Sequence, residues 1–190
     1  RDLVRVRDVV AFAREGGYRT PSLWLSEGFD WARAQGVTAP LYAEIDGDAM
    51  RAFTLHGERE LHPDAPATHL SYYEADAVAR FLGHRLPTEF EWEHAATAQA
   101  TAQATESGGA FAALYDTVWQ WTASAFGPYP GFRPPAGAIG EYNGKFMSGQ
   151  QVLRGGSVYS PPGHVRATYR NFFPSASRWA FSGVRLARDQ

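Results

Sequence analysis

The clearest helical pattern of apolar residues follows Ser71. Ser71 and Glu74 have the spacing of a capping box, in which the serine oxygen accepts from a first-turn amide and the glutamate reaches back. Gly83 then supplies a C-terminal stop. The apolar positions between them share one helix face: Ala75, Val78, Ala79 and Leu82. We predict a helix here and interpret Glu74 as its cap rather than as a catalytic acid.

A second capping box starts the next predicted helix. Thr88 and Glu91 repeat the spacing, so Glu91 is also interpreted as a cap and not as a catalytic acid. We expect Phe90, Ala95 and Ala96 to point inward from this helix.

Residues 98–109 lose all apolar periodicity. The letters TAQA repeat and end in Ser-Gly-Gly. Small polar repeats bury too little surface to fix one conformation. We therefore predict that 98–109 is the end of a helix running into a variable, low-complexity surface loop, poorly ordered and without a function of its own.

Shorter helical segments are predicted nearer the N-terminus. The apolar run 9–13 precedes Gly16, and Gly36 would end a later helix. Thr20-Pro21 and Ser26-Glu27 have the residue types of two successive helix starts. We expect the large side chains of this region to point inward: Leu23, Trp24, Phe29 and Trp31.

Alternating and short apolar runs predict strands. The runs 41–45 and 50–54 flank Asp46-Gly47-Asp48, which is typical of a hairpin. The stretch 114–124 predicts a short strand or turn, and 152–153 and 184–186 predict strands that frame the last third of the chain. Few short helices, many short strands and long connections indicate an α+β fold with high loop content.

Composition narrows the class of protein. The chain has 190 residues, 44% of them hydrophobic, which suits one domain with a sizeable core. The absence of cysteine excludes disulfides and thiolate metal sites. A net charge of -2 without long basic runs argues against nucleic acid, and no apolar run is long enough for a membrane span. Because the chain opens with RDLVRVRD, we expect a piece of a longer polypeptide, 1–190 being one domain.

Four sequence blocks carry a family resemblance. They are RLPTEFEWEHAA (85–96), TVWQWTAS (117–124), VLRGGS (152–157) and SGVRLARD (182–189). In this order they resemble the formylglycine-generating-enzyme/sulfatase-modifying domain, a variant of the C-type lectin fold. Formylglycine generators use two cysteines after the RGGS block, where this chain has Ser160 and Ala167. Without a thiolate pair their soft copper site is lost, and with it their oxidation chemistry.

A second resemblance covers nearly the whole chain. GGYRTPSLWLSEGFDWARAQG (16–36), YPGFRPPAGAIGEYNGKFM (129–147) and HVRATYRNFFPSASRWAFSGVRLARD (164–189) are similar to the C-terminal domain of ergothioneine-pathway sulfoxide synthases. The resemblance implies a cytoplasmic, iron(II)-dependent oxidoreductase that joins a thiol to the imidazole of N-α-trimethylhistidine with dioxygen. It also implies that three histidines of an amino-terminal helical domain bind the Fe(II). The 6 histidines of this chain have no helical i,i+3 or i,i+4 pairing, so we assign no metal ligand here.

The resemblance also implies a set of substrate-binding residues. Tyr142 and Asn171 match positions that help to hold trimethylhistidine, and neutral hydrogen bonds suit that task. Phe172 and Phe173 would form the pocket wall, because a quaternary ammonium is attracted by aromatic faces. From the residues alone, the favoured interpretation is that Asn171 caps a turn and that the two phenylalanines are ordinary core. Arg178 is left open as a substrate-facing residue.

Two substitutions concern the sulfur donor. The branch of the family that uses γ-glutamylcysteine has an acidic residue at the position of Phe173 and an active-site tyrosine at that of Ile139. The loss of both groups favours the branch that takes free cysteine. We therefore assign no catalytic acid or base to this chain. Arg154 and Arg185, which lie beside strand residues, are expected to brace loops by binding backbone carbonyls and buried carboxylates.

Two alternatives remain open at this point. The first is a non-catalytic lectin-like module that binds sugar or peptide, often with calcium, although Gln120 replaces an acidic residue that could be a calcium ligand. The second is a related synthase of the selenoneine or ovothiol pathway.

Overall fold

A computed structural model describes residues 2–103 and 113–189, with 99–103 and 142–143 described by their backbone alone. The fold is mixed α+β, as predicted. Its helices are α1 (Val6–Arg14), η1 (Gly17–Arg19), η2 (Pro21–Leu23), α2 (Ser26–Ala34), α3 (Tyr72–Phe81), α4 (Glu89–Gln103) and α5 (Ala138–Gly144). Its strands are β1 (Ala43–Asp46), β2 (Ala49–Thr54), β3 (Gly57–Glu60), β4 (Trp119–Ala125), β5 (Gln150–Gly155), β6 (Asn171–Pro174) and β7 (Ser182–Gly183).

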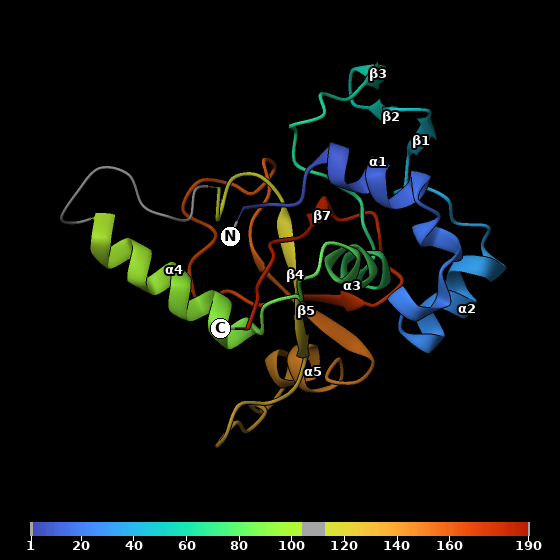
Figure 1. Cartoon of the computed structure of the whole chain (residues 1–190). Coiled ribbons are helices and arrows are strands. Elements are labelled where there is room, and N and C mark those ends of the chain that lie inside the picture. The colour runs from blue at the N-terminus through green and yellow to red at the C-terminus, as the bar shows by residue number, and fades with distance from the viewer. Residues whose placement is uncertain (1, 104–112, 190) are drawn as a thin grey trace.

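A four-stranded sheet of order β6-β5-β4-β7 forms the centre of the molecule. The β4–β5 and β5–β6 pairs are antiparallel, whereas β4 and β7 are parallel. Figure 1 places α4 on one side of β4 and β5, and α1, α2 and α3 on the other. The edge position of β6 suits Pro174, which has no amide hydrogen to donate to a further strand.

The main core lies between this sheet and the N-terminal helices. Trp121 of β4 is fully buried and donates its indole N–H to the Leu70 carbonyl at 2.8 Å. Its ring meets Tyr72 at the start of α3, and Phe12 of α1 belongs to the same buried core. In the part of the chain that is described, no helix is long and apolar enough to cross a membrane.

Both predicted capping boxes are confirmed. Ser71 Oγ accepts from the Glu74 amide at 3.0 Å, and Glu74 accepts from the Ser71 amide at 2.9 Å. Thr88 and Glu91 make the equivalent pair of bonds at 3.2 and 2.7 Å. Glu91 also pairs with Arg85, which lowers the pKa of its carboxyl group to about 2.

The helix end predicted within 98–109 is confirmed, whereas the inward orientation predicted for Phe90 was wrong. The helix continues to Gln103, because alanine and glutamine are strong helix formers. The remaining loop positions, 104–109, lie outside the described residues. Phe90 is 62% exposed, and Trp92, which is 2% exposed, is the inward anchor instead. Trp92 and Ala96 are one turn apart and share the buried face.

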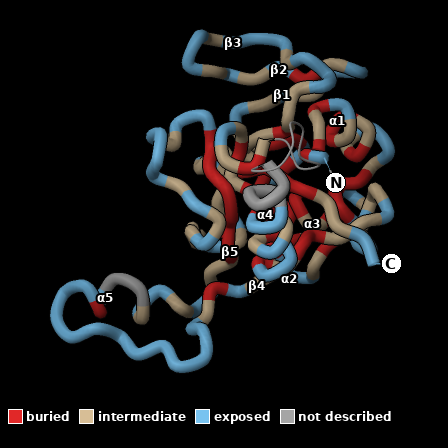
Figure 2. Tube along the Cα trace, turned by 90° about the vertical axis from the view of Figure 1, so that its left-hand side faces the viewer, coloured by how far each residue is buried: buried red, intermediate tan, exposed pale blue. Residues whose placement is uncertain are grey.

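The predicted hairpin is confirmed and belongs to a separate three-stranded sheet of order β1-β2-β3. Gly47 in its turn has a φ of 56°, a left-handed value that glycine adopts without strain. The third strand, β3, was not predicted because its sequence GERE has no apolar alternation. Figure 2 shows this sheet as a mostly exposed layer above the body.

The predicted strand 184–186 was also wrong. The regular pairing is at Ser182–Gly183, and Arg185 makes an isolated bridge to Leu3. A second isolated bridge joins Ala187 to Arg85, so this end of the chain pairs with two different segments and with neither over a continuous ladder. Neither β6 nor α5 was predicted, since β6 ends in proline and α5 contains glycine.

Candidate functional site

A cavity of about 510 Å³ lies at the edge strand β6. Its size falls within the range of small-molecule pockets. The lining combines aromatic rings with a few polar groups: Phe146, Gln150, Arg166, Tyr169, Arg170, Asn171, Phe172, Phe173 and Pro174. Figure 2 shows the segment that carries α5 projecting from the body as a largely exposed arm, which ends where β5 begins.

Aromatic rings form the walls of this cavity. Phe172 stacks on Phe126 with ring centroids 3.9 Å apart and an interplanar angle of 8°. Phe146, from the end of the arm, approaches the same Phe172 ring at 6.0 Å. Phe173 packs against the main core and meets Trp179 edge-on at 4.7 Å. These contacts hold both phenylalanines of β6 in place at the cavity.

Asn171 occupies the first position of β6, opposite Leu153 of β5. Its side-chain oxygen accepts from the Phe172 amide at 3.0 Å, a local bond that orients the side chain. Its amide nitrogen has no partner among the described residues. That N–H₂ group can therefore donate to a molecule in the cavity.

A buried ionic cluster lies behind the cavity, with Glu89 of α4 at its centre. Glu89 is 2% exposed and accepts two bonds from Arg170, at 2.8 and 2.9 Å. It also accepts from Arg154 at 2.9 Å and from the Tyr129 hydroxyl at 3.0 Å. Burial raises the pKa of Tyr129, so its hydroxyl stays protonated and remains a donor to the carboxylate.

Arg154 is an internal brace, as predicted. Its side chain is fully buried on β5 and also pairs with Glu93 at 2.8 Å. It donates to the carbonyls of Ala167 and Tyr169, at 3.0 and 3.3 Å. Because these carbonyls belong to the segment that leads into β6, the cluster fixes α4, β5 and the cavity lining relative to one another.

Arg185 is also a brace, as predicted. It donates to the side-chain oxygen of Gln120 at 3.0 Å, and burial lowers the pKa of its guanidinium. Gln120 is fully buried and accepts at the same oxygen from Trp92 at 2.8 Å. The oxygen of Gln120 is thus used inside the fold, so it is not offered to a calcium ion.

Of the remaining two predicted site residues, Arg178 is not part of the cavity lining. Arg178 donates to the Ala39 carbonyl at 3.1 Å, lies over the Trp31 ring, and pairs with the buried Glu74 at 3.7 Å. These are the contacts of a brace beside α3, so the structure gives Arg178 a bracing role, and the expectation that it faces substrate stays a prediction. Burial raises the pKa of Glu74 despite this pairing. Tyr142 lies in α5, where only its backbone is described.

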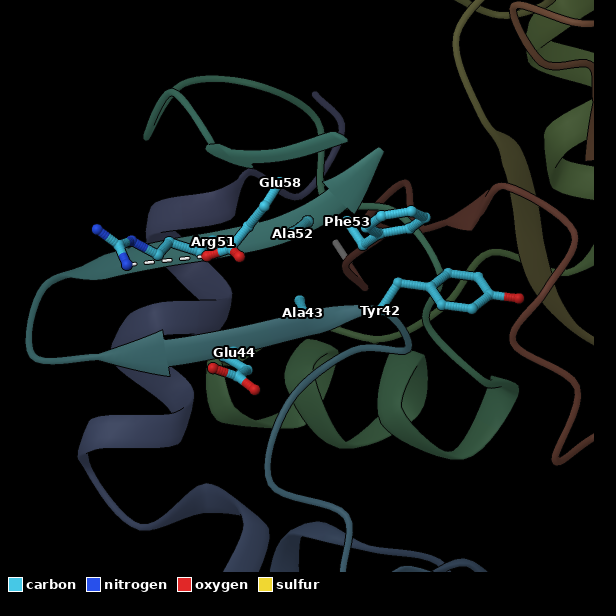
Figure 3. Close-up of a pocket in the computed structure, with 7 residues that line it drawn as sticks. All are labelled: Tyr42, Ala43, Glu44, Arg51, Ala52, Phe53 and Glu58. Carbon is cyan, nitrogen blue, oxygen red and sulfur yellow. Dashed lines mark ion pairs between the residues drawn. The ribbon is translucent and has the colours of Figure 1, made fainter. Parts of the chain in front are cut away.

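A second hollow, of about 300 Å³, lies on the outer sheet (Figure 3). Figure 3 shows Arg51 paired with Glu58 across neighbouring strands, and the rings of Tyr42 and Phe53 at one end of the hairpin. Phe53 is 72% exposed, and the Arg51–Glu58 contact is 3.8 Å long with both side chains exposed. This hollow contains none of the predicted site residues, and two of its charged groups, Arg51 and Glu58, already pair with each other.

The described residues do not fit an iron site. Within 2–103 and 113–189 there is no group of three or more His, Cys, Asp or Glu side chains that could hold a metal ion. The cavity lining offers two amides, a phenol, guanidinium groups and rings, and among its described residues it has none of the histidine or carboxylate side chains that usually hold iron(II). No chemical step through a metal is therefore derived from this chain.

Sequence reasoning missed the central residue of the site. Glu89 follows the predicted cap Thr88, where an acidic side chain is expected near a helix N-terminus in any case. Its partners Arg154 and Arg170 lie 65 and 81 residues further along the chain. The residues next to Glu89 in the sequence do not indicate that it pairs with Arg154 and Arg170.

Comparison with known proteins supports one family over the whole chain. Residues 3–113 and 111–190 match the family described as Sulfatase-modifying factor enzyme 1-like domain. The chain is 33% identical to Hercynine oxygenase of Mycolicibacterium smegmatis over 94% of its length, which is 49% of that protein. It is 34% identical to Hercynine oxygenase of Mycobacterium tuberculosis, again over 94% of this chain and 49% of the relative.

The chain thus spans about half the length of the curated relatives that it matches. Among solved structures, PvdO from Pseudomonas aeruginosa aligns with a TM-score of 0.43 and 19% identity, covering 88% of this chain and 78% of PvdO.

Proposed function

Since the chain belongs to the family of Sulfatase-modifying factor enzyme 1-like domains, we propose that it is the substrate-binding half of an ergothioneine-pathway sulfoxide synthase. The proposal is supported by the relatives named Hercynine oxygenase, hercynine being N-α-trimethylhistidine. The observation that carries it is the aromatic cavity at β6, because a quaternary ammonium is attracted by aromatic faces. The protein is proposed to act in the cytoplasm.

The residues of this chain bind and orient the substrate. Phe172 and Phe146 line the cavity and are proposed to contact the trimethylammonium group, and their rings also exclude water from that side. Asn171 donates its free amide hydrogens to the ligand. Tyr142, on α5, is proposed to contact the same ligand.

The oxidation chemistry belongs to an iron(II) ion, which we place in an amino-terminal helical domain of the longer polypeptide. The thiol S–H and one imidazole C–H bond break, while one C–S and one S=O bond form. Dioxygen gives one oxygen atom to the sulfoxide and the other to water, so atoms and electrons balance. This chain contributes the binding surface on which the imidazole is presented.

Free cysteine is the proposed sulfur donor. Phe173 packs against the apolar core and Trp179, so no carboxylate stands there to bind a larger charged donor. Ile139, on α5, is 75% exposed and provides no proton. Both positions favour the smaller thiol.

The test uses the full-length polypeptide that contains this chain. With iron(II), dioxygen and trimethylhistidine, we expect the sulfoxide product by mass spectrometry, formed faster from cysteine than from γ-glutamylcysteine. If neither thiol is consumed, the proposed function is wrong.

A binding-site variant tests the role of the cavity. Asn171→Ala should raise the Michaelis constant for trimethylhistidine roughly tenfold, the effect of one lost ligand hydrogen bond. Gln35→Ala is the matched control, because Gln35 carries the same amide group at the exposed end of α2. Equal Michaelis constants for trimethylhistidine in the two variants would show that Asn171 has a structural role.

A further inference from the structure

The cavity at β6 is lined by two positive charges and, among the described residues, by no carboxylate. Arg170 is neutralised from behind, because both of its bonds to Glu89 are charge-assisted and nearly buried. Arg166 is the second charge. Among the residues that the structure describes, it forms no ion pair.

The contacts that Arg166 makes among the described residues do not use its terminal nitrogens. Its Nε donates to the Thr168 hydroxyl at 3.1 Å, and its guanidinium carbon lies 5.7 Å from the centre of the Tyr169 ring. The two terminal nitrogens have no partner in the described part of the chain. Two parallel N–H groups of this kind match the two oxygens of a carboxylate.

The unpaired charge restricts which ligands the cavity accepts. A quaternary ammonium alone would gain from the rings but would meet the positive charge of Arg166 without a compensating anion. A zwitterion brings its own carboxylate. The cavity therefore suits a ligand whose cationic and anionic ends lie a few bonds apart.

We propose that Arg166 is a specificity-determining residue, which binds the carboxylate of an amino-acid betaine while the aromatic lining holds its trimethylammonium group. The inference rests on the proposed function for the identity of the betaine. It adds that the site selects the intact amino acid over the decarboxylated amine.

The test compares two ligands in the full-length enzyme: trimethylhistidine and its decarboxylated analogue, trimethylhistamine. Arg166→Gln should raise the Michaelis constant for trimethylhistidine about tenfold or more and leave kcat at saturation nearly unchanged. The constant for trimethylhistamine should change less than twofold. Arg166→Lys should raise this Michaelis constant less than Arg166→Gln does, because lysine keeps the positive charge but lacks the paired N–H groups of the guanidinium.

Arg33→Gln is the matched control. Arg33 is also exposed and lies 5.8 Å from the centre of an aromatic ring, that of Phe29, but it is on α2 and does not line the cavity. Its kinetics should equal those of the wild type. Thermal midpoints of all variants should agree, since both arginines lie at the surface.

Several outcomes would overturn the inference. An equal rise in the Michaelis constants for both ligands would show that Arg166 does not bind the carboxylate. A rise only in the Michaelis constant for cysteine would show that Arg166 binds that substrate instead. Binding of both ligands is also measured by calorimetry without thiol. Selective binding without sulfoxide formation would refute the proposed function and leave the role of Arg166 standing.

Discussion

Replacing Glu89 with glutamine should destabilise the protein severely, although the two side chains have nearly the same shape. The change removes the one negative charge that lies between Arg154 and Arg170. A glutamine keeps one acceptor oxygen but turns an N–H₂ group toward the guanidinium donors. Breaking a buried ion pair by removing one partner costs roughly 3–5 kcal/mol, because the other charge stays buried without compensation.

The surroundings place the expected cost at the lower end of that range. Arg154 is fully buried but retains Glu93, whose carboxylate lies 2.8 Å away and is 32% exposed. Arg170 is 14% exposed and loses its carboxylate partner altogether. Glu89→Gln should therefore lower the free energy of unfolding by about 3 kcal/mol.

Urea denaturation measures this cost. With a slope of about 2 kcal/mol per molar urea, the midpoint should fall by about 1.5 M while the slope stays constant. Glu91→Gln is the control on the same helix, because its ion pair is exposed and glutamine can still complete a capping box. The control should lose less than about 1 kcal/mol. If Glu89→Gln were as stable as this control, the buried cluster would not be what holds the cavity to α4.

Three further predictions concern stability. Arg85 holds the pKa of Glu91 at about 2 against an ordinary 4.5, so the pair should contribute stability above pH 4.5 that is lost as the pH falls through 2. At this exposed site the contribution should be below about 1 kcal/mol. Thermal melts of Glu91→Gln should lack this fall of the midpoint with falling pH. Gly163→Ala should lower the free energy of unfolding, measured by urea denaturation, by roughly 1 kcal/mol, and Gly155→Ala should lower it several times as much. Both glycines have a positive φ, but only at Gly155 would the new Cβ lie 2.3 Å from a carbonyl oxygen. Equal losses in the two variants would contradict this reasoning. Trp92→Ala should cost about 3–5 kcal/mol and Phe90→Ala less than about 0.5, measured in the same way, and the reverse order would mean that the α4 face is misassigned.

Local chemistry decided which parts of the fold could be predicted. The capping boxes at Ser71 and Thr88 involve residues three apart, so their geometry follows from the sequence alone. The hairpin around Gly47 was predictable for the same reason. In contrast, β6 was not predictable, because its neighbour β5 lies about twenty residues earlier and its own pattern is weak.

The candidate site divides in the same way. The resemblance of 164–189 singled out Asn171, Phe172 and Phe173, and the fold brings all three to one cavity. It could not show that Arg178 turns toward Glu74 instead, or that Arg166 lies at the cavity without an ion pair among the described residues. These outcomes depend on which side chains from distant segments reach the same place.

The sequence by itself determined the helix boundaries with strong caps, the α+β class and the segment that carries the cavity. The tertiary structure alone decided the pairing of Glu89 with Arg154 and Arg170, and hence which arginine of the cavity has no ion pair among the described residues. The physical reason is that capping and turn bonds join near neighbours in the chain. A buried charge, by contrast, must find its partner wherever the packed sheet and helices bring one within about 3 Å.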